Sequence, residues 1–244
     1  MFSLKHCFAL TFCALCQIAA AQIAPGAPAD FGTIKEAEGP KSIRIYVTNV
    51  GTEPTALLKV KPTCGCTAVS FMEEKFEPGD SAWIDLTYDP SRRPGRFEKG
   101  VKVYPVNGDM IRIPITGVVL ATPETVSTIF PIDASPLHLT EKTLISPVPL
   151  DKEPRKFYID VYNSGQEDAT YSLLSQDEAV TTHILGNPLP PGERGLITIT
   201  VDPKKEERTG KLEYSLQLTT GSGSSCSESN TPGLPVEIKI ITEK

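Results

Sequence analysis

Three short patterns occur twice in this chain, at offsets of 113 to 115 residues. The paired segments are 43–51 with 157–165, 77–90 with 190–203, and 93–97 with 208–212. They contain, in order, an alternating stretch that ends in Asn-x-Gly, a Pro-Gly turn before an Asp-Pro corner, and a turn with glycine two residues after arginine. Offsets this constant predict two copies of one domain.

Within each copy, apolar and polar residues alternate as they do in strands that bury one face. The residues expected to point inward are Ile43, Ile45, Val47, Ile84, Leu86 and Tyr88 in the first copy, and Phe157, Ile159, Val161, Ile197, Ile199 and Val201 in the second. Turn residues separate the stretches, and the chain holds 22 Pro and 18 Gly. About seven short strands per copy predict an all-β chain of two tandem immunoglobulin-like β-sandwich domains.

The repeat also predicts where the domains lie. We expect the first sandwich at 28–120 and a second, degenerate sandwich at 137–244. Residues 121–136 are rich in Thr and Pro and show no clean alternation, so they are predicted to be a linker. No stretch of the chain has the pattern of an amphipathic helix.

Residues 1–21 have the pattern of an export signal, with Lys5 as their only charged residue, an apolar core and three alanines before Gln22. We place the cleavage before Gln22 and expect the protein in the periplasm or at the cell surface. The apolar core is too short to span a bilayer comfortably. An acyl anchor on Cys13 or Cys16 is disfavoured, because a bulky residue precedes each of them where the lipoprotein peptidase needs a small one.

Composition excludes two classes of function. Lys and Arg number 24 against 30 Asp and Glu, and there is no basic block, so we expect no nucleic-acid partner. No second apolar run of about 20 residues follows the signal, so we expect no transmembrane span after cleavage. The mature chain keeps Cys64, Cys66 and Cys226, which cannot all pair within one molecule.

Several segments of the first copy together resemble the bacterial domain-of-unknown-function family 1573. These segments are Asp30-Phe-Gly-Thr-Ile34, Asn49-Val-Gly51, Lys61-Pro-Thr-Cys-Gly-Cys-Thr67, Pro78-Gly79 and Tyr88-Asp-Pro90. The resemblance implies an exported immunoglobulin-like sandwich, related to those of sperm and cilium-associated proteins, with no assigned activity. It covers 28–119, and the second copy lacks the Cys-Gly-Cys motif, so any chemistry of the motif belongs to the first copy.

Cys64 and Cys66 admit three interpretations. A disulfide across one glycine closes a small ring that is strained and exchanges readily, although glycine relieves part of the strain. Two thiolates, with Met72 nearby in sequence, would suit Cu(I), whereas a zinc site lacks further ligands. The simplest interpretation is that both are small buried residues that anchor the loop, paired or not.

Sandwich topology places three arginines near these cysteines. Cys-Gly-Cys falls between the third and fourth strands, while Arg92, Arg93 and Arg96 fall between the fifth and sixth, at the same end. Cationic neighbours stabilise a thiolate, so these residues are candidate modulators of the thiols. The segment 221–233 with Cys226 is expected at the facing end of the second sandwich, which would bring all three cysteines near the junction. The alternative interpretation of the segment 221–233 is a solvated Gly/Ser loop.

Two aromatic residues of the first copy, Tyr46 and Trp83, are predicted to point outward on neighbouring strands. Tyr158 and Tyr162 are expected on the same face of the second copy. Such rings stack on sugar rings or pack against protein. We expect packing on linker residues such as Phe130 or on a partner protein, with a glycan ligand as the alternative.

The chain contains no nucleophile elbow, no phosphate-binding glycine loop and no HExxH motif, and neither His138 nor His183 accompanies a nucleophile motif. We therefore expect an exported, non-enzymatic binding or assembly module with a protein or cell-envelope partner. It would act through a sheet edge or the outer face of its strands. The alternative function is a thiol-redox or copper-handling protein that uses Cys64 and Cys66.

Overall fold

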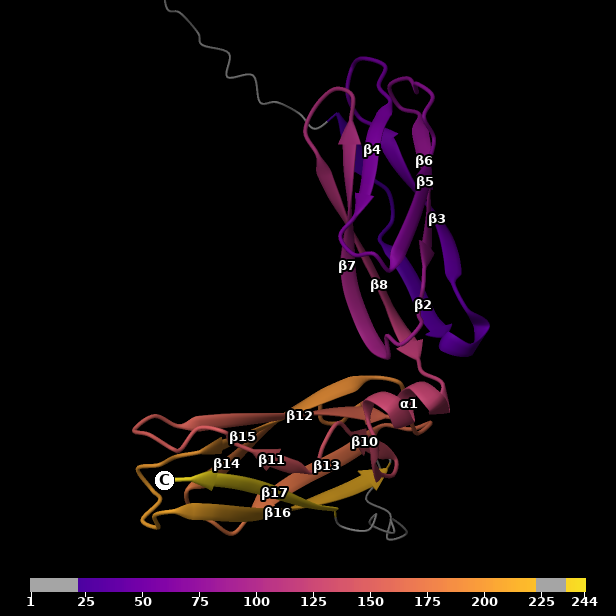
Figure 1. Cartoon of the computed structure of the whole chain (residues 1–244). Coiled ribbons are helices and arrows are strands. Elements are labelled where there is room, and N and C mark those ends of the chain that lie inside the picture. The colour runs from indigo at the N-terminus through magenta and orange to yellow at the C-terminus, as the bar shows by residue number, and fades with distance from the viewer. Residues whose placement is uncertain (1–21, 223–235) are drawn as a thin grey trace, which may run out of the picture.

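The computed structural model describes residues 22–222 and 236–244. The predicted signal peptide, 1–21, and the segment 223–235 with Cys226 lie outside the described residues. The described chain is all-β apart from one short α-helix and one turn of 3-10 helix. It folds as two tandem immunoglobulin-like sandwiches, and the second lies across one end of the first (Figure 1).

The first sandwich packs two four-stranded sheets face to face, in the orders β1-β3-β6-β5 and β2-β8-β7-β4. Its elements are β1 (Ile23–Pro25), β2 (Ala29–Lys35), η1 (Glu36–Glu38), β3 (Lys41–Asn49), β4 (Leu57–Pro62), β5 (Thr67–Phe71), β6 (Ser81–Tyr88), β7 (Gly95–Pro105) and β8 (Ile111–Leu120). The predicted inward residues Ile84, Leu86 and Tyr88 are almost wholly buried. The strand alternation therefore identified the core of this sandwich correctly.

The first sandwich has one strand more than the sequence predicted, because its first strand divides between the two sheets. β1 pairs antiparallel with β3, whereas β2 pairs parallel with β8 in the opposite sheet. Between them lies 26–28, Gly-Ala-Pro, where the proline lacks a backbone donor for a continuous ladder.

The second sandwich repeats this plan, with sheets in the orders β14-β15-β12-β10-β9 and β11-β17-β16-β13. Its strands are β9 (Ile132–Ala134), β10 (Leu137–Leu139), β11 (Thr143–Ile145), β12 (Arg155–Asn163), β13 (Ala169–Ser175), β14 (Val180–Leu185), β15 (Arg194–Val201), β16 (Lys211–Ser222) and β17 (Val236–Glu243). The parallel pair β11 and β17 corresponds to β2 and β8 of the first sandwich. Each sandwich has its own core, and the two cores share no residue.

The expectation that no helix forms is wrong for the predicted linker, which contains α1 (Pro123–Ile129). The Thr122 hydroxyl caps this helix by accepting a hydrogen bond from the amide of Thr125, and Pro123 occupies the first turn. Seven residues are too few to show an amphipathic period, so the capping residue Thr122 and the following Pro123 were the sequence features that could have indicated this helix. None of the helices formed by the described residues is long and apolar enough to cross a membrane.

Candidate functional site

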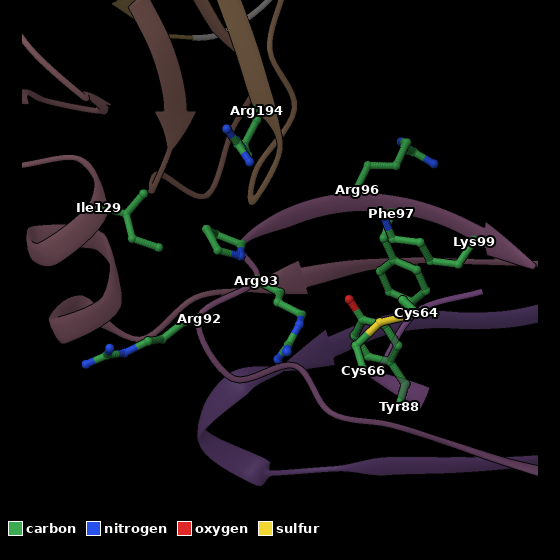
Figure 2. Close-up of a pocket in the computed structure, with 12 residues that line it drawn as sticks. Cys64, Cys66, Tyr88, Arg92, Arg93, Arg96, Phe97, Lys99, Ile129 and Arg194 are labelled. Carbon is green, nitrogen blue, oxygen red and sulfur yellow. A yellow bond between two sulfur atoms is a disulfide. The ribbon is translucent and has the colours of Figure 1, made fainter. Parts of the chain in front are cut away.

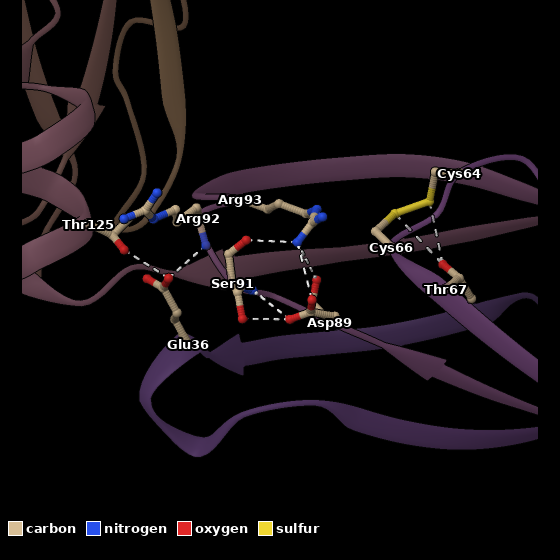
Figure 3. Close-up of polar contacts among 9 residues, drawn as sticks. All are labelled: Glu36, Cys64, Cys66, Thr67, Asp89, Ser91, Arg92, Arg93 and Thr125. Carbon is tan, nitrogen blue, oxygen red and sulfur yellow. Dashed lines mark hydrogen bonds and ion pairs between the residues drawn. A yellow bond between two sulfur atoms is a disulfide. The ribbon is translucent and has the colours of Figure 1, made fainter.

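The junction between the sandwiches is organised by one carboxylate of the first sandwich, Glu36. It accepts hydrogen bonds from the amide of Arg92 at 2.7 Å and from the hydroxyl of Thr125 at 2.8 Å (Figure 3). The amide of Thr122 also donates to it, at 2.9 Å. Burial acts to raise the pKa of Glu36, but these hydrogen bonds outweigh it and hold the pKa below its usual range. Glu36 therefore joins the turn before β7 to the start of α1.

On its other side, α1 packs against the second sandwich through aromatic residues. Phe130, at the end of the helix, is fully buried and stacks on Tyr162 of β12, with ring centroids 5.4 Å apart. The expectation that an outward tyrosine packs on Phe130 is confirmed for Tyr162, which is 2% exposed. The guanidinium of Arg194 lies 5.6 Å from the centre of the Phe130 ring. These contacts bring Arg194 to the end of the first sandwich.

Close approach of the sandwiches requires glycine at two turns. A Cβ on Gly95 would lie 2.8 Å from the side chain of Arg194, and one on Gly192 would lie 2.1 Å from the side chain of Leu120. Both residues also have positive φ, +96° and +73°. The equivalent glycines of the other repeat are Gly210 for Gly95 and Gly79 for Gly192. Neither is crowded, since a Cβ on Gly79 or Gly210 would meet nothing within 4 Å.

The Cys-Gly-Cys motif lies between β4 and β5, and its two cysteines form a disulfide with Cα atoms 5.3 Å apart. Cys66 is 6% exposed and belongs to the core, whereas Cys64 is half-buried at the edge of that core. The hydroxyl of Thr67 lies 3.6 and 3.9 Å from the two sulfur atoms, which as a disulfide can only accept its hydrogen bond (Figure 3). The aromatic rings of Tyr88 and Phe97, stacked 4.0 Å apart, line the same region.

This disulfide forms part of the wall of a hollow of about 440 Å³ at the junction (Figure 2). We call this hollow the arginine pocket. Its lining residues are Cys64, Gly65, Cys66, Tyr88, Arg92, Arg93, Pro94, Arg96, Phe97, Lys99, Ile129 and Arg194. Five of them are cationic and none is Asp or Glu, so the pocket is electropositive although the chain as a whole carries a net charge of −6.

Three of the five cations are paired with carboxylates outside the pocket. Arg93 lies 3.5 Å from Asp89, Arg194 lies 3.0 Å from Asp160, and Arg96 pairs with Glu193 of the second sandwich. The ion pairs found among the described residues do not include Arg92 or Lys99. The pocket therefore has two cationic side chains without a carboxylate partner in the described part of the chain, Lys99 on the side of the disulfide and Arg92 pointing away from it on the side of α1 (Figure 2).

The predicted grouping of the motif with the arginines is found in the structure, because Arg92, Arg93 and Arg96 all line the pocket that the disulfide lines. Their effect on the thiols stays a prediction, and Cys226 lies outside the described residues. Sequence reasoning missed Lys99, Arg194 and Glu36. Lys99 lies on β7, the strand that also carries Arg96, so the topology that placed Arg96 near the cysteines could have placed Lys99 there too. The positions of Arg194 and Glu36 depend on how the two sandwiches meet.

The other predicted surface lies on β3 and β6, where Tyr46 and Trp83 are directly opposite each other. Tyr46 is 52% exposed, and the guanidinium of Arg44 lies 4.8 Å from the centre of the Trp83 ring. Arg44 also donates two hydrogen bonds to Asp85, at 2.6 and 2.7 Å. Polar side chains on this face are thus largely satisfied within the sheet, and binding of a glycan or protein there stays a prediction.

Copper binding by the cysteines also stays a prediction, and it concerns their reduced form, because a disulfide offers no thiolate. Met72, its proposed further ligand, packs against the core and is not part of the arginine pocket. Within 22–222 and 236–244, no three His, Cys, Asp or Glu side chains gather as a metal site.

A second hollow, of about 610 Å³, lies beside α1 and contains His138 and Tyr162 in its lining. It is lined mainly by apolar and small residues, and its lining contains no Asp, Glu, Lys or Arg. Ser127 and Ser164 line this hollow with His138, but their hydroxyls donate to the carbonyls of Glu124 and Pro136.

A family model described as "Protein of unknown function (DUF1573)" matches residues 26–119, which is the first sandwich. This sandwich belongs to the DUF1573 family. The resemblance noted in the sequence is thereby confirmed, and the DUF1573 sandwich is the part of the chain that carries the disulfide and four of the five pocket cations. The family description names no activity.

Solved structures resemble the chain only distantly. A protein of unknown function from Porphyromonas gingivalis W83 is 15% identical, with a TM-score of 0.37, covering 92% of this chain and 100% of that one. The PapD-like domain 7 of human CEP192 is 13% identical, with a TM-score of 0.35, covering 46% and 86%. Mouse clustered PcdhgC3 EC1-3 is 14% identical, with a TM-score of 0.29, covering 91% and 67%. Such scores mean that the backbones superpose poorly, and none of these proteins supports the proposals below. No curated protein matches the chain at a significant level.

Proposed function

We propose that the protein is an exported binding module of the periplasm or cell surface, and that it binds an oxyanion of a partner in the arginine pocket. One observation carries this proposal: a chain with a net charge of −6 gathers five cationic side chains around one hollow whose lining contains no acid. Such a concentration creates a local positive potential that attracts anions. Export is supported by the pattern of residues 1–21.

The side chains of the pocket suit a carboxylate or phosphate group. Arginine presents a planar fork of donors that can hold two oxygens of such a group at once, while lysine acts as a compact charge. Arg92 and Lys99 make no ion pair among the described residues, so we expect Lys99 to bind the oxyanion beside the disulfide and Arg92 to attract it from the side of α1 (Figure 2). Tyr88 and Phe97 add an apolar wall for the rest of the ligand.

Two sources of this oxyanion fit an exported module, an acidic segment of a partner protein and a phosphate-bearing component of the cell envelope. Both sandwiches contribute cations, since Arg194 comes from the second and the others from the first. We therefore expect binding to strengthen the contact between the sandwiches. Binding of this kind needs no chemical step.

The proposal predicts that anions bind in the arginine pocket and that two substitutions weaken them. A hexaglutamate peptide and inorganic phosphate are titrated separately into the isotopically labelled protein at low ionic strength. We expect amide shift changes centred on the lining residues. The double substitution Arg92→Gln with Lys99→Gln should weaken the affinity about tenfold or more, because each charge-assisted hydrogen bond contributes about 1.5–3 kcal/mol.

Lys59→Gln with Lys75→Gln is the matched control, because both lysines are exposed and neither lines the pocket. It makes the same change of charge, so an effect of net charge alone would appear in it equally. Tighter binding of the peptide than of phosphate supports an acidic protein segment, and the reverse order supports a phosphate-bearing component. The proposal fails if neither anion shifts the lining residues, or if Arg92→Gln with Lys99→Gln binds as Lys59→Gln with Lys75→Gln does.

A further inference from the structure

The Cys64–Cys66 disulfide is not needed for the backbone corner beside it, because the second sandwich builds the same corner without cysteine. In the first sandwich the amide of Asp89 donates to the carbonyl of Cys66 at 2.9 Å. In the second, the amide of Asp202 donates to the carbonyl of Ala179 at 2.8 Å. Alanine therefore suffices for this corner, and the cysteine pair calls for a reason other than the fold.

The two sulfur atoms differ in their access to solvent. Cys66 is 6% exposed and lies within the core, whereas Cys64 is half-buried at its edge. Exchange of a disulfide begins with attack of a thiolate on the sulfur that it can reach. An incoming thiolate in the pocket would therefore attack Cys64, and Cys66 would be the leaving group.

The surroundings of the disulfide favour an attacking thiolate, and a hydroxyl lies close to the sulfur that would leave. Five cationic side chains and no acidic ones line the pocket that holds the disulfide. The hydroxyl of Thr67 lies 3.6 Å from the sulfur of Cys64 and 3.9 Å from that of Cys66. Electropositive, partly exposed surroundings of this kind characterise reactive cysteines.

We propose that Cys64–Cys66 is a thiol–disulfide exchange centre that reacts preferentially with thiols carried by anionic partners. A thiolate R–S⁻ attacks Sγ of Cys64, the bond between the two cysteine sulfurs breaks, and its electron pair goes to Sγ of Cys66. The product is a mixed disulfide between R and Cys64, with Cys66 as the thiolate. With a single thiol, the step reverses when Cys66 attacks Sγ of Cys64 and releases R–S⁻.

With a dithiol partner the exchange goes to completion. The second thiolate of the partner attacks the R sulfur of the mixed disulfide and releases Cys64 as a thiolate. The partner thereby loses two electrons and becomes a disulfide, while the cysteine pair gains these electrons and takes up the two protons released from the partner's thiols. The preference for anionic thiols rests on the proposed anion site, whereas the exchange itself does not.

The test compares glutathione, a thiol with two carboxylates, with cysteamine, a thiol with an ammonium group. Each is incubated with the full chain at low ionic strength, free thiols are then trapped by alkylation, and fragmentation mass spectrometry locates the adduct. Each rate is divided by the rate of the same thiol with a neutral small disulfide, which removes differences in intrinsic reactivity. We expect the adduct on Cys64, alkylation on Cys66, and a normalised rate about tenfold higher for glutathione.

The preference should shrink towards onefold at about 0.5 M salt and in the variant Arg92→Gln with Lys99→Gln, but not in Lys59→Gln with Lys75→Gln, which makes the same change of charge. Equal normalised rates at low salt would refute the anionic preference, and the separate titrations with hexaglutamate and phosphate decide whether the anion site fails with it. Adducts that form mainly on Cys66 would overturn the assigned order of attack. Absence of any adduct on either cysteine, under conditions in which a synthetic peptide of residues 60–75 reacts, would overturn the exchange centre even if anions bind the pocket.

Discussion

Substitution of Phe130 by alanine is expected to destabilise the packing of α1 on the second sandwich by about 3–5 kcal/mol, the usual cost of deleting a buried phenyl ring. Phe130 is fully buried, stacks on Tyr162 and lies under the guanidinium of Arg194. Its removal leaves a cavity that the short helix cannot fill without moving. We expect faster hydrogen exchange of the amides of 121–134 and a lower unfolding midpoint in urea.

The same substitution should weaken anion binding in the arginine pocket, because Arg194 loses the ring that helps to position it. Thr128→Ala is the control, since Thr128 is exposed on the same helix and its hydroxyl bonds only within it. We expect this control to change the free energy of unfolding by about 0.5 kcal/mol or less. Exchange rates in Phe130→Ala that match those of the control would show that the aromatic contact does not hold the junction.

Substitution of Glu206 by glutamine is expected to lower the stability of the second sandwich by about 3 kcal/mol at neutral pH. Glu206 is 5% exposed and accepts three hydrogen bonds from Arg208 and one from the hydroxyl of Tyr214 at 2.7 Å. The hydrogen bonds from Arg208 outweigh the effect of burial and lower the pKa of Glu206 from 4.5 to about 2.

The sign of the pH dependence follows from this lowered pKa. The charged form is bound more tightly in the folded state, so its contribution is complete above pH 4.5 and is lost as the pH falls towards 2. Urea unfolding of the second sandwich should therefore show a wild-type advantage over Glu206→Gln of about 3 kcal/mol at pH 7 that shrinks towards zero near pH 2. Subtracting the free energies of unfolding of the two proteins at each pH cancels the contribution of all other carboxylates, because these titrate in both proteins.

Glu207→Gln is the matched control for this experiment, because Glu207 is the exposed neighbour of Glu206. It should follow the wild-type curve to within about 0.5 kcal/mol at every pH. A difference between wild type and Glu206→Gln that stays constant from pH 7 to pH 2 would mean that the loss comes from packing and not from the charge.

The strands and their cores were accessible from the sequence because strand burial is a local pattern. Ile45 and Ile84 point inward in the structure, as do Ile159 and Ile197 of the second repeat, because successive side chains of a strand alternate between its two faces. The repeat doubled this signal. The placement of the Cys-Gly-Cys loop beside Arg92–Arg96 was also accessible, since sandwich topology brings alternate loops to one end.

The parts that the sequence analysis missed are short or depend on contacts between distant segments. α1 is too short for its period to show, although its caps at Thr122 and Pro123 were present in the sequence. The division of the first strand into β1 and β2 needed knowledge of both sheets. Glu36 carries no motif, and its role depends on Thr122 and Thr125, which follow it by 86 and 89 residues.

Local sequence patterns were enough to predict the all-β class, the two sandwiches and the end of the first sandwich at which cysteines and arginines meet. The folded chain was needed to show that Cys64 and Cys66 are bonded, that Tyr162 is buried under Phe130, and that Arg194 completes an electropositive pocket. The difference comes from how far apart in the chain the interacting residues lie. Alternation and turn chemistry act between neighbours in the chain and leave a periodic signature, whereas the meeting of two sandwiches is set by a few contacts between distant residues, such as Gly95 against Arg194, which leave none.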